Sequence, residues 1–363
     1  MPCALRFARV SISITMTNSY AATLTTDVTE TAEGAAFIPD SLSPEKGNRI
    51  APALAALTTA SALSACGGGG NEPLQATQAS GSDAMPKPAF EGFSYPAPTS
   101  DAEAARFLLH AQFSASTEEI ASLRSTTYVD WLNRQFDASP GVTGWDWLNT
   151  RGYAAISNDT AYYDNSYPAD YMIWYQLMKS PDGLRKRIAL ALSEICVVSL
   201  SGVDVNWRCH AMAWYWDQLV NNAFGNYRNV LQDVTLNPAM GYYLNTRGNQ
   251  KENPATGRQP DENYAREVMQ LMSIGLVELN LDGTPKLDSN GKPIDSYTMN
   301  DVTNLARVFT GYDFDQSQNV PTTVPGTTRV VPNTTYTRLP MALNASRHST
   351  LAATFLGTTI PAN

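Results

Sequence analysis

The stretch LRKRIALALSEICVVSL, residues 184–200, indicates the fold class of this chain. After a basic first turn it is apolar on most sides, and the turn Ser180–Gly183 precedes it. A helix that is apolar around most of its circumference is normally buried among other helices. We therefore expect a central buried helix around which further helices pack.

Apolar residues recur at helical spacing through most of the chain after residue 100, which predicts helices on both sides of this stretch. Ser100 offers an N-cap for the first of them, and Gly225 offers a C-cap for a later one. The predicted helices cover residues 101–113, 117–123, 128–136, 168–178, 207–224, 227–236, 261–275 and 298–310.

One segment carries a strand pattern instead. The dipeptides Asp282-Gly283 and Asn290-Gly291 are typical of hairpin turns, and apolar residues flank them. Residues 315–340, rich in Thr, Pro and Val, favour loops or short strands. The predicted fold class is mainly α: a single large multi-helix domain with one small β-hairpin insertion near 277–297.

Composition excludes several classes of protein. The 363 residues are 43% hydrophobic and 10% aromatic, which is a folding composition and not a disordered one. The net charge of -9, without a basic stripe, disfavours nucleic-acid binding, because the chain would repel phosphate. No run of about 18 apolar residues occurs, which excludes a polytopic membrane protein.

The first 66 residues resemble an export signal. Lys46 and Arg49 precede an apolar stretch, residues 50–63, and small residues lead to Cys66. The tetrapeptide Leu63–Cys66 resembles a bacterial lipobox, in which the cysteine thiol receives the lipid and becomes the new N-terminus. We therefore predict an exported lipoprotein, lipidated at Cys66 and held in the cell envelope by its lipid alone, at the outer membrane or periplasmic face.

The domain organisation follows from this reading. Residues 1–66 form the leader and lipoprotein signal, and the Gly-, Pro- and Ser-rich residues 67–98 form a flexible tether. Residues 99–363 form the helical domain. Within it, Cys196 and Cys209 could pair in an oxidising compartment or remain thiols, and the apolar surroundings of Cys196 favour buried thiols.

The segment DENYARE, residues 261–267, is the best candidate for a functional site. Glu262 and Arg266 form an i,i+4 pair in the favoured order on the predicted helix. Glu267 falls at the edge of the apolar stripe, where a carboxylate is partly desolvated and needs a partner. Asn263 lies on the polar side of Glu267, so an amide, a guanidinium and carboxylates gather there.

The helix over 298–310 contributes to the same cluster. Thr298 and Asp301 form a capping box. Arg307 lies off the apolar face, from which it could reach a carboxylate such as Glu267. The polar cluster of Glu262, Asn263, Arg266, Glu267 and Arg307 could pin two helices together, which is the favoured interpretation. It could also bind or turn over a polar substrate with Glu267 as general base.

Other residues give weaker indications of a site. His110, His210 and His348 lack metal-ligand spacing, and the Asp- and Asn-rich turns lack a full calcium-loop pattern. We therefore predict no metal, and no residue identifies a cofactor. The Tyr- and Trp-rich segments could stack on sugars, but helical spacing assigns most of them to the core.

Long motifs carry a resemblance to a known family. The residues 184–199, 221–245, 262–267 and 301–312 resemble the bacterial domain-of-unknown-function family 1800, over roughly 103–363. The resemblance implies an exported, mainly helical protein with a secreted sulfatase-like partner protein. It implies no catalytic residue. Ser349 follows His348 where the family usually has Asp, and the pattern breaks off at Asn363, so we expect a C-terminally incomplete domain.

Two functions remain open from the sequence. The first is an exported lipoprotein whose helical domain binds or assembles with another secreted protein. The alternative is an envelope hydrolase that acts on a polymer, with Glu267 and Asp301 as its carboxylates.

Overall fold

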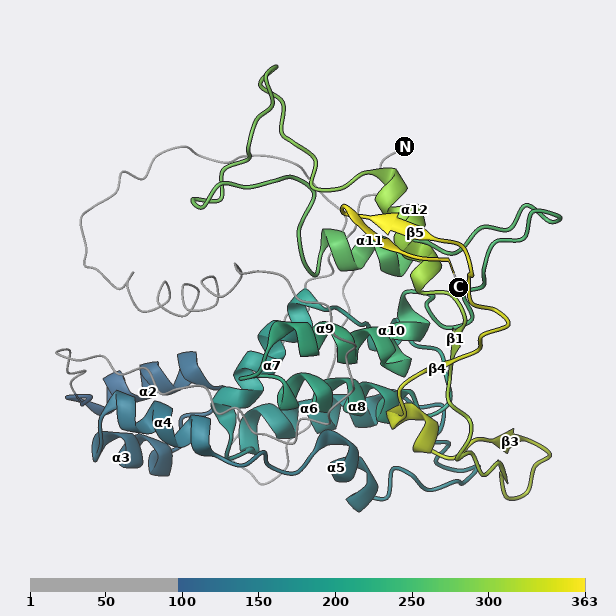
Figure 1. The fold of residues 1–363 in the computed structure, drawn as a ribbon. Coiled ribbons are helices and arrows are strands. Elements are labelled where there is room, and N and C mark those ends of the chain that lie inside the picture. The colour runs from purple at the N-terminus through teal and green to yellow at the C-terminus, as the bar shows by residue number, and fades with distance from the viewer. Residues whose placement is uncertain (1–96, 363) are drawn as a thin grey trace, which may run out of the picture. The chain divides into compact units, whose positions relative to one another are not determined.

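Helices dominate the part of the chain that can be described. The computed structural model describes residues 97–362, which belong to one of the two units into which the chain divides, Gly81–Asn363. These residues contain eleven α-helices and only small two-stranded sheets, so the predicted mainly α class is confirmed (Figure 1). The predicted signal, Cys66 and nearly all of the predicted tether lie outside the described residues.

Helix α8 (Arg208–Asn221) forms the centre of the largest core. Nine of its fourteen residues are buried, including Trp216 and Leu219. It packs against the five helices α5 (Gly144–Thr150), α6 (Tyr167–Lys179), α7 (Gly183–Ile195), α9 (Tyr227–Leu236) and α10 (Pro238–Tyr243).

The predicted central helix is therefore the wrong one. The stretch that begins at Leu184 is α7, and only three of its thirteen residues are buried. The helix also ends at Ile195, which is 44% exposed, and the chain continues irregularly before a short 3-10 turn at Leu200–Gly202. The apolar residues of α7 lie on several half-buried faces of the helix, because α7 packs against α8 on one side and against α2 and α4 on another.

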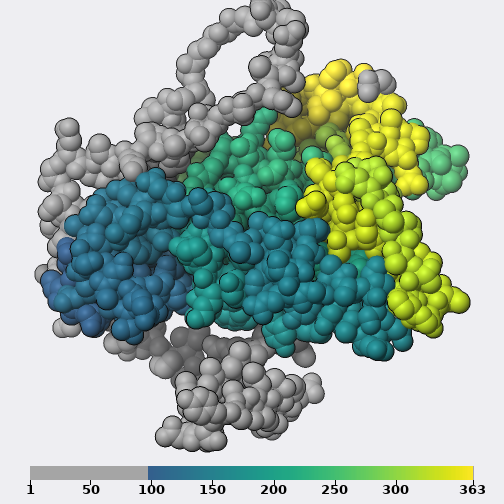
Figure 2. Space-filling view, turned by 90° about the horizontal axis from the view of Figure 1, so that it is seen from below, coloured from purple at the N-terminus to yellow at the C-terminus, as the bar shows by residue number. Residues whose placement is uncertain are grey.

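A second group of helices lies beside α7. It consists of α2 (Asp101–Ala111), α3 (Thr117–Arg124) and α4 (Tyr128–Asp137), which share a core around Leu108, Leu123 and Trp131. Residues 312–362 lie on the opposite side of the central helices, as Figure 2 shows.

Helices α11 (Asn263–Gln270) and α12 (Met299–Val308) pack against each other. Between them, residues 277–295 pair antiparallel through Val277 with Asp295, Leu279 with Pro285, and Leu287 with Pro293. The predicted hairpin insertion is thus present.

Three further sheets follow α12, each with two short antiparallel strands. They pair β1 (Tyr312–Asp313) with β4 (Ala342–Leu343), β2 (Thr322–Thr323) with β3 (Val330–Val331), and β5 (Ala353–Phe355) with β6 (Thr358–Ile360). A 3-10 turn, Thr335–Arg338, lies between β3 and β4. Strand β5 packs on α12.

The core contains both thiols and several ionisable groups. Cys196 and Cys209 are buried and unpaired, so the buried-thiol alternative holds. Asp217 of α8 accepts hydrogen bonds from the backbone N–H groups of Gly144 (2.6 Å) and Trp145 (2.9 Å), which begin α5. His210 is also buried, and its Nε2 lies 3.3 Å from Asn149 Oδ1. Within residues 97–362, no helix has the length and apolar character needed to span a membrane.

Candidate functional site at the α11–α12 junction

Backbone and amide hydrogen bonds fix the start of α11. The Asn249 side chain accepts from Asp261 N (2.8 Å) and donates to Asp261 O (3.0 Å). The N-cap residue of α11 is Glu262, not Asp261 as predicted, but Asp261 Oδ1 accepts from Asn263 N at 2.9 Å just before the helix. Asn249 O also accepts from Gly311 N, which follows α12. Asn249 therefore contacts the start of α11 through its side chain and the segment after α12 through its backbone carbonyl.

Glu262 joins the two helices. Its Oε2 accepts from Arg266 Nη2 at 3.0 Å, which confirms the predicted i,i+4 ion pair. Its Oε1 accepts from Thr303 Oγ1 of α12, also at 3.0 Å. Both members of the ion pair are about one-third exposed, so the bond to Thr303 is the part that ties the helices together.

Asp301 is committed to structural hydrogen bonds. Its Oδ2 accepts from Thr298 N and Oγ1, both at 2.7 Å, which confirms the predicted capping box. Its Oδ1 accepts from Leu356 N, in the turn between β5 and β6, at 2.8 Å. The hydroxyl of Thr298 is the main cause that lowers the pKa of Asp301. Such a carboxylate stays ionised and is a weak candidate for a catalytic acid.

The structure does not bring Arg307 to Glu267. Arg307 Nη1 instead donates to Asn304 Oδ1 (2.8 Å) and to the carbonyl of Ala352, just before β5 (3.2 Å). The half-buried Glu267 carboxylate forms no hydrogen bond or ion pair with any residue in 97–362. The predicted cluster is therefore two separate groups, because the rotation of α12 directs Arg307 toward the β5–β6 hairpin.

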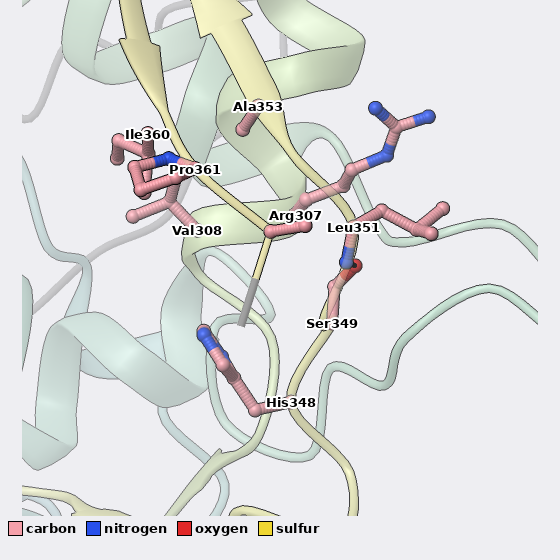
Figure 3. Close-up of a pocket in the computed structure, with 9 residues that line it drawn as sticks. Arg307, Val308, His348, Ser349, Leu351, Ala353, Ile360 and Pro361 are labelled. Atoms are coloured by element: carbon pink, nitrogen blue, oxygen red, sulfur yellow. Dashed lines mark hydrogen bonds between the residues drawn. The ribbon is translucent and has the colours of Figure 1, made fainter.

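A small cavity lies at the end of α12 that bears Arg307. Its volume is about 280 Å³. Figure 3 shows the His348 ring directed toward Val308 and Pro361, whereas the Arg307 guanidinium extends away from His348. The lining residues are Arg307, Val308, His348, Ser349, Leu351, Ala353, Ile360, Pro361 and Ala362.

A hydrogen bond to a buried backbone carbonyl fixes the orientation of the His348 ring. Its Nδ1 lies 2.7 Å from the carbonyl oxygen of Thr310, a residue with no solvent exposure. Because a carbonyl can only accept, the neutral ring carries its proton on Nδ1, and Nε2 keeps a lone pair. An imidazole held in this way can accept a proton or ligate a cation.

Ser349 occupies the position at which the resemblance implies an aspartate. Its Oγ donates to Glu252, at 2.9 Å to Oε1 and 3.0 Å to Oε2, and its backbone N donates to Thr310 Oγ1 at 2.8 Å. A carboxylate is therefore present beside the histidine segment, but it comes from a different part of the chain.

The sequence gives no local signal for this arrangement. Glu252 and Ser349 are 97 residues apart and belong to no shared spacing pattern. Thr310 contributes its backbone carbonyl to His348 and its hydroxyl to Ser349 N. Within 97–362, no group of three or more His, Cys, Asp or Glu side chains is arranged to hold a metal ion.

Comparisons with known proteins identify a family. Residues 106–363 match the family described as protein of unknown function (DUF1800). No curated protein matches the chain, and no solved structure does.

Proposed function

The chain belongs to the DUF1800 family, and from its surface and sequence we propose that it is an exported lipoprotein whose helical body binds another exported protein. The observation that carries the proposal is an exposed row of leucines on the segment between α11 and α12. We name residues 276–296 the arm. The arm projects from the helices in Figure 1.

The arm exposes apolar side chains that a soluble surface normally keeps covered. Leu276, Leu279 and Leu287 are each more than half exposed, and Leu281, at the first turn, is fully exposed. Single exposed leucines are ordinary, but several on one projecting segment are typical of a protein contact surface. The apolar character therefore favours a protein partner.

Backbone hydrogen bonds hold the arm in one conformation. Glu278 N donates to Ile294 O (2.9 Å), Ile294 N to Lys286 O (3.0 Å), and Lys286 N to Glu278 O (2.8 Å). The segments around Glu278, Lys286 and Ile294 are thus each hydrogen-bonded to the other two. Gly283 and Gly291, with φ of +83° and +76°, form the two tight turns. A preorganised arm loses little conformational entropy on binding.

The polar cluster supports binding over catalysis. Glu262 and Asp301 are engaged in bonds that position helices, and Glu267 has no partner within 97–362 that would orient it as a base. A hydrolase would need carboxylates free to exchange protons beside a substrate cleft. We therefore favour the binding role over the envelope hydrolase.

The partner that the family resemblance implies is a secreted sulfatase-like protein. The test is affinity capture of the full-length lipoprotein from envelope fractions of cells that carry both proteins. We compare the wild type with the double variant L281S/L287S. Burying a leucine contributes roughly 1.5–3 kcal/mol, so the variant should recover the partner at least about tenfold less efficiently.

The matched control is L109S, because Leu109 is also about half exposed but lies on α2. It should recover the partner as well as the wild type does. Equal recovery by the wild type and the arm variant, or no stoichiometric exported protein with the wild type, would contradict the proposal.

The lipid anchor has a separate test. The mature N-terminus, determined by mass spectrometry of the envelope protein, should be a diacylated Cys66, and Cys66→Ser should abolish lipidation. A mature chain that begins at another residue and carries no lipid would contradict the anchor without affecting the arm.

A further inference from the structure

A buried acid and a buried amine lie one helical turn apart at the start of α7. Asp182 is the N-cap residue of this helix, and Lys186 follows at i+4. Their side chains are 0% and 1% exposed, and Lys186 Nζ lies 3.5 Å from Asp182 Oδ2. Both groups are thus withdrawn from water but face each other.

The surroundings of the pair are closely packed. Ser180 Oγ donates to Asp182 Oδ1. A Cβ atom on Gly141 would lie 3.2 Å from that same oxygen, and one on Gly183 would lie 2.4 Å from Gln112 Oε1. The backbone therefore closes over the carboxylate and excludes solvent.

The second carboxylate oxygen is poorly satisfied. Asp182 Oδ2 has no hydrogen-bond partner within residues 97–362. Its nearest cations are Lys186 Nζ at 3.5 Å and Arg185 Nε at 3.8 Å, both longer than a good charge-assisted hydrogen bond. Burial lowers the pKa of Lys186, although Asp182 and Asp217 oppose this. A buried ion pair with incomplete hydrogen bonding is costly to keep as two charges.

The geometry suits a reaction between the two groups. Side chains at i and i+4 lie on the same face of a helix, with Cβ atoms roughly 5–6 Å apart. The four-carbon stem of lysine can bring Nζ onto the carboxyl carbon without a change in the backbone. Asp217 keeps its two backbone N–H donors whether or not the reaction occurs.

We propose that Lys186 and Asp182 condense into an intramolecular isopeptide bond. Nζ of Lys186, after losing a proton to the carboxylate, attacks Cγ of Asp182. The C–N bond forms and one C–O bond breaks. That oxygen leaves as water with both protons that the ammonium group gives up, so no oxidant or co-reactant is needed. The product is a neutral amide in place of two buried charges, and it closes a covalent ring across the first turn of α7.

The test is a peptide map of the full chain after denaturation and trypsin digestion. An amide at Nζ prevents cleavage after Lys186. The expected product is Ser180–Arg185 joined through its Asp182 side chain to the dipeptide of Lys186 and Arg187, lighter by one water than the two separate peptides. Tandem mass spectrometry locates the joined residues.

Two variants serve as controls. Lys186→Arg retains the positive charge but has no nucleophilic amine, so it should yield Ser180–Arg185 and no joined peptide. Asp182→Ala should likewise yield no joined peptide. A succinimide at Asp182-Gly183 would also remove one water, but from Ser180–Arg185 alone, without the joined dipeptide, and it would persist in Lys186→Arg.

The wild-type map decides the proposal without reliance on the folding of the variants. Ser180–Arg185 at its full mass, together with complete cleavage after Lys186, would overturn it and leave an ordinary buried ion pair. This outcome is independent of the arm and of any partner protein.

Discussion

Glu262, the N-cap residue of α11, and Glu267, within the helix, differ in their hydrogen-bond partners. Glu262 accepts from Arg266 and Thr303, whereas Glu267 has no polar partner within residues 97–362. The difference arises partly from the neighbouring helix, because Thr303 of α12 donates to Glu262 and no side chain within residues 97–362 donates to Glu267. Residue type alone therefore does not determine which carboxylate is structural.

This difference gives a prediction at the scale of one residue. Glu262→Gln should lower the free energy of unfolding by about 1 kcal/mol, since a charge-assisted bond becomes a neutral one and the pair is partly exposed. Glu267→Gln should change it by less than about 0.5 kcal/mol. Urea unfolding of both variants measures this, and a larger loss for Glu267→Gln would contradict the assignment.

The sequence predicted the local half of this cluster and missed the rest. The Glu262–Arg266 pair was predictable because both residues lie on one helix at fixed spacing. The expected Arg307–Glu267 contact does not form, because the direction of the Arg307 side chain depends on how α12 is rotated against α11. The hydrogen bond from Ser349, beside His348, to Glu252 joins residues 97 positions apart, about which sequence spacing carries no information.

Among the elements, α12 and the β5–β6 hairpin are joined through one carboxylate. Asp301 caps its own helix and also accepts from Leu356 N in the hairpin turn. Arg307 adds a second link one and a half turns later, to the Ala352 carbonyl. The hairpin therefore has hydrogen bonds to α12 at both of its ends.

We expect Asp301→Ala to lower the free energy of unfolding by more than the loss of an N-cap interaction alone would. Loss of an N-cap interaction typically costs about 1 kcal/mol, and the unpaired Leu356 N–H adds about 1 kcal/mol or more. The matched control is Asp130→Ala, because Asp130 pairs with Thr126 and Thr127 at the start of α4 and, within residues 97–362, with no second element. Thermal unfolding should show the larger loss for Asp301→Ala, and equal losses would mean that the hairpin link contributes nothing.

Helix positions were largely predictable, while short elements were not. Caps and apolar periodicity predicted 227–236 at its observed bounds and 117–123 to within one residue. Helices α5 and α10, with seven and six residues, are too short for periodicity to register. Four of the six strands have only two residues, so alternation cannot reveal them.

At the scale of the whole molecule, two buried groups make the stability of the fold depend on pH in opposite directions. Burial raises the pKa of Asp217 from 3.8 to about 6, and burial lowers the pKa of His210 from 6.5 to about 4. The folded state binds the Asp217 proton more tightly than the unfolded state does, so this group makes stability fall as pH rises from about 4 to 6. The unfolded state binds the His210 proton more tightly, so this group makes stability rise over about the same interval.

We therefore expect the two effects to oppose each other in the wild type. Asp217→Asn removes the group whose contribution to stability falls as pH rises. The free energy of unfolding of the variant, relative to that of the wild type, should therefore increase by about 3 kcal/mol between pH 4 and pH 7. Its loss of one backbone acceptor is a cost at every pH. Denaturant unfolding across this range measures the difference, and a difference independent of pH would contradict the raised pKa.

Aromatic residues show where whole-molecule packing overrides sequence pattern. Trp207 and Trp216 are buried as predicted, but Tyr171 and Trp174 are each 58% exposed on α6 at equally regular spacing. The same helical spacing of apolar residues is compatible with a buried helix face and with an exposed one. Only the arrangement of the neighbouring helices distinguishes them.

The hydrogen bond from Ser349 to Glu252 restricts which residue types relatives of this chain can have at these two positions. An aspartate after the histidine would set a second negative charge against Glu252, and two carboxylates at that distance repel unless one is protonated. Acidic residues at the two positions should therefore exclude each other. In an alignment of the family they should covary, with serine accompanying glutamate and aspartate accompanying an uncharged partner.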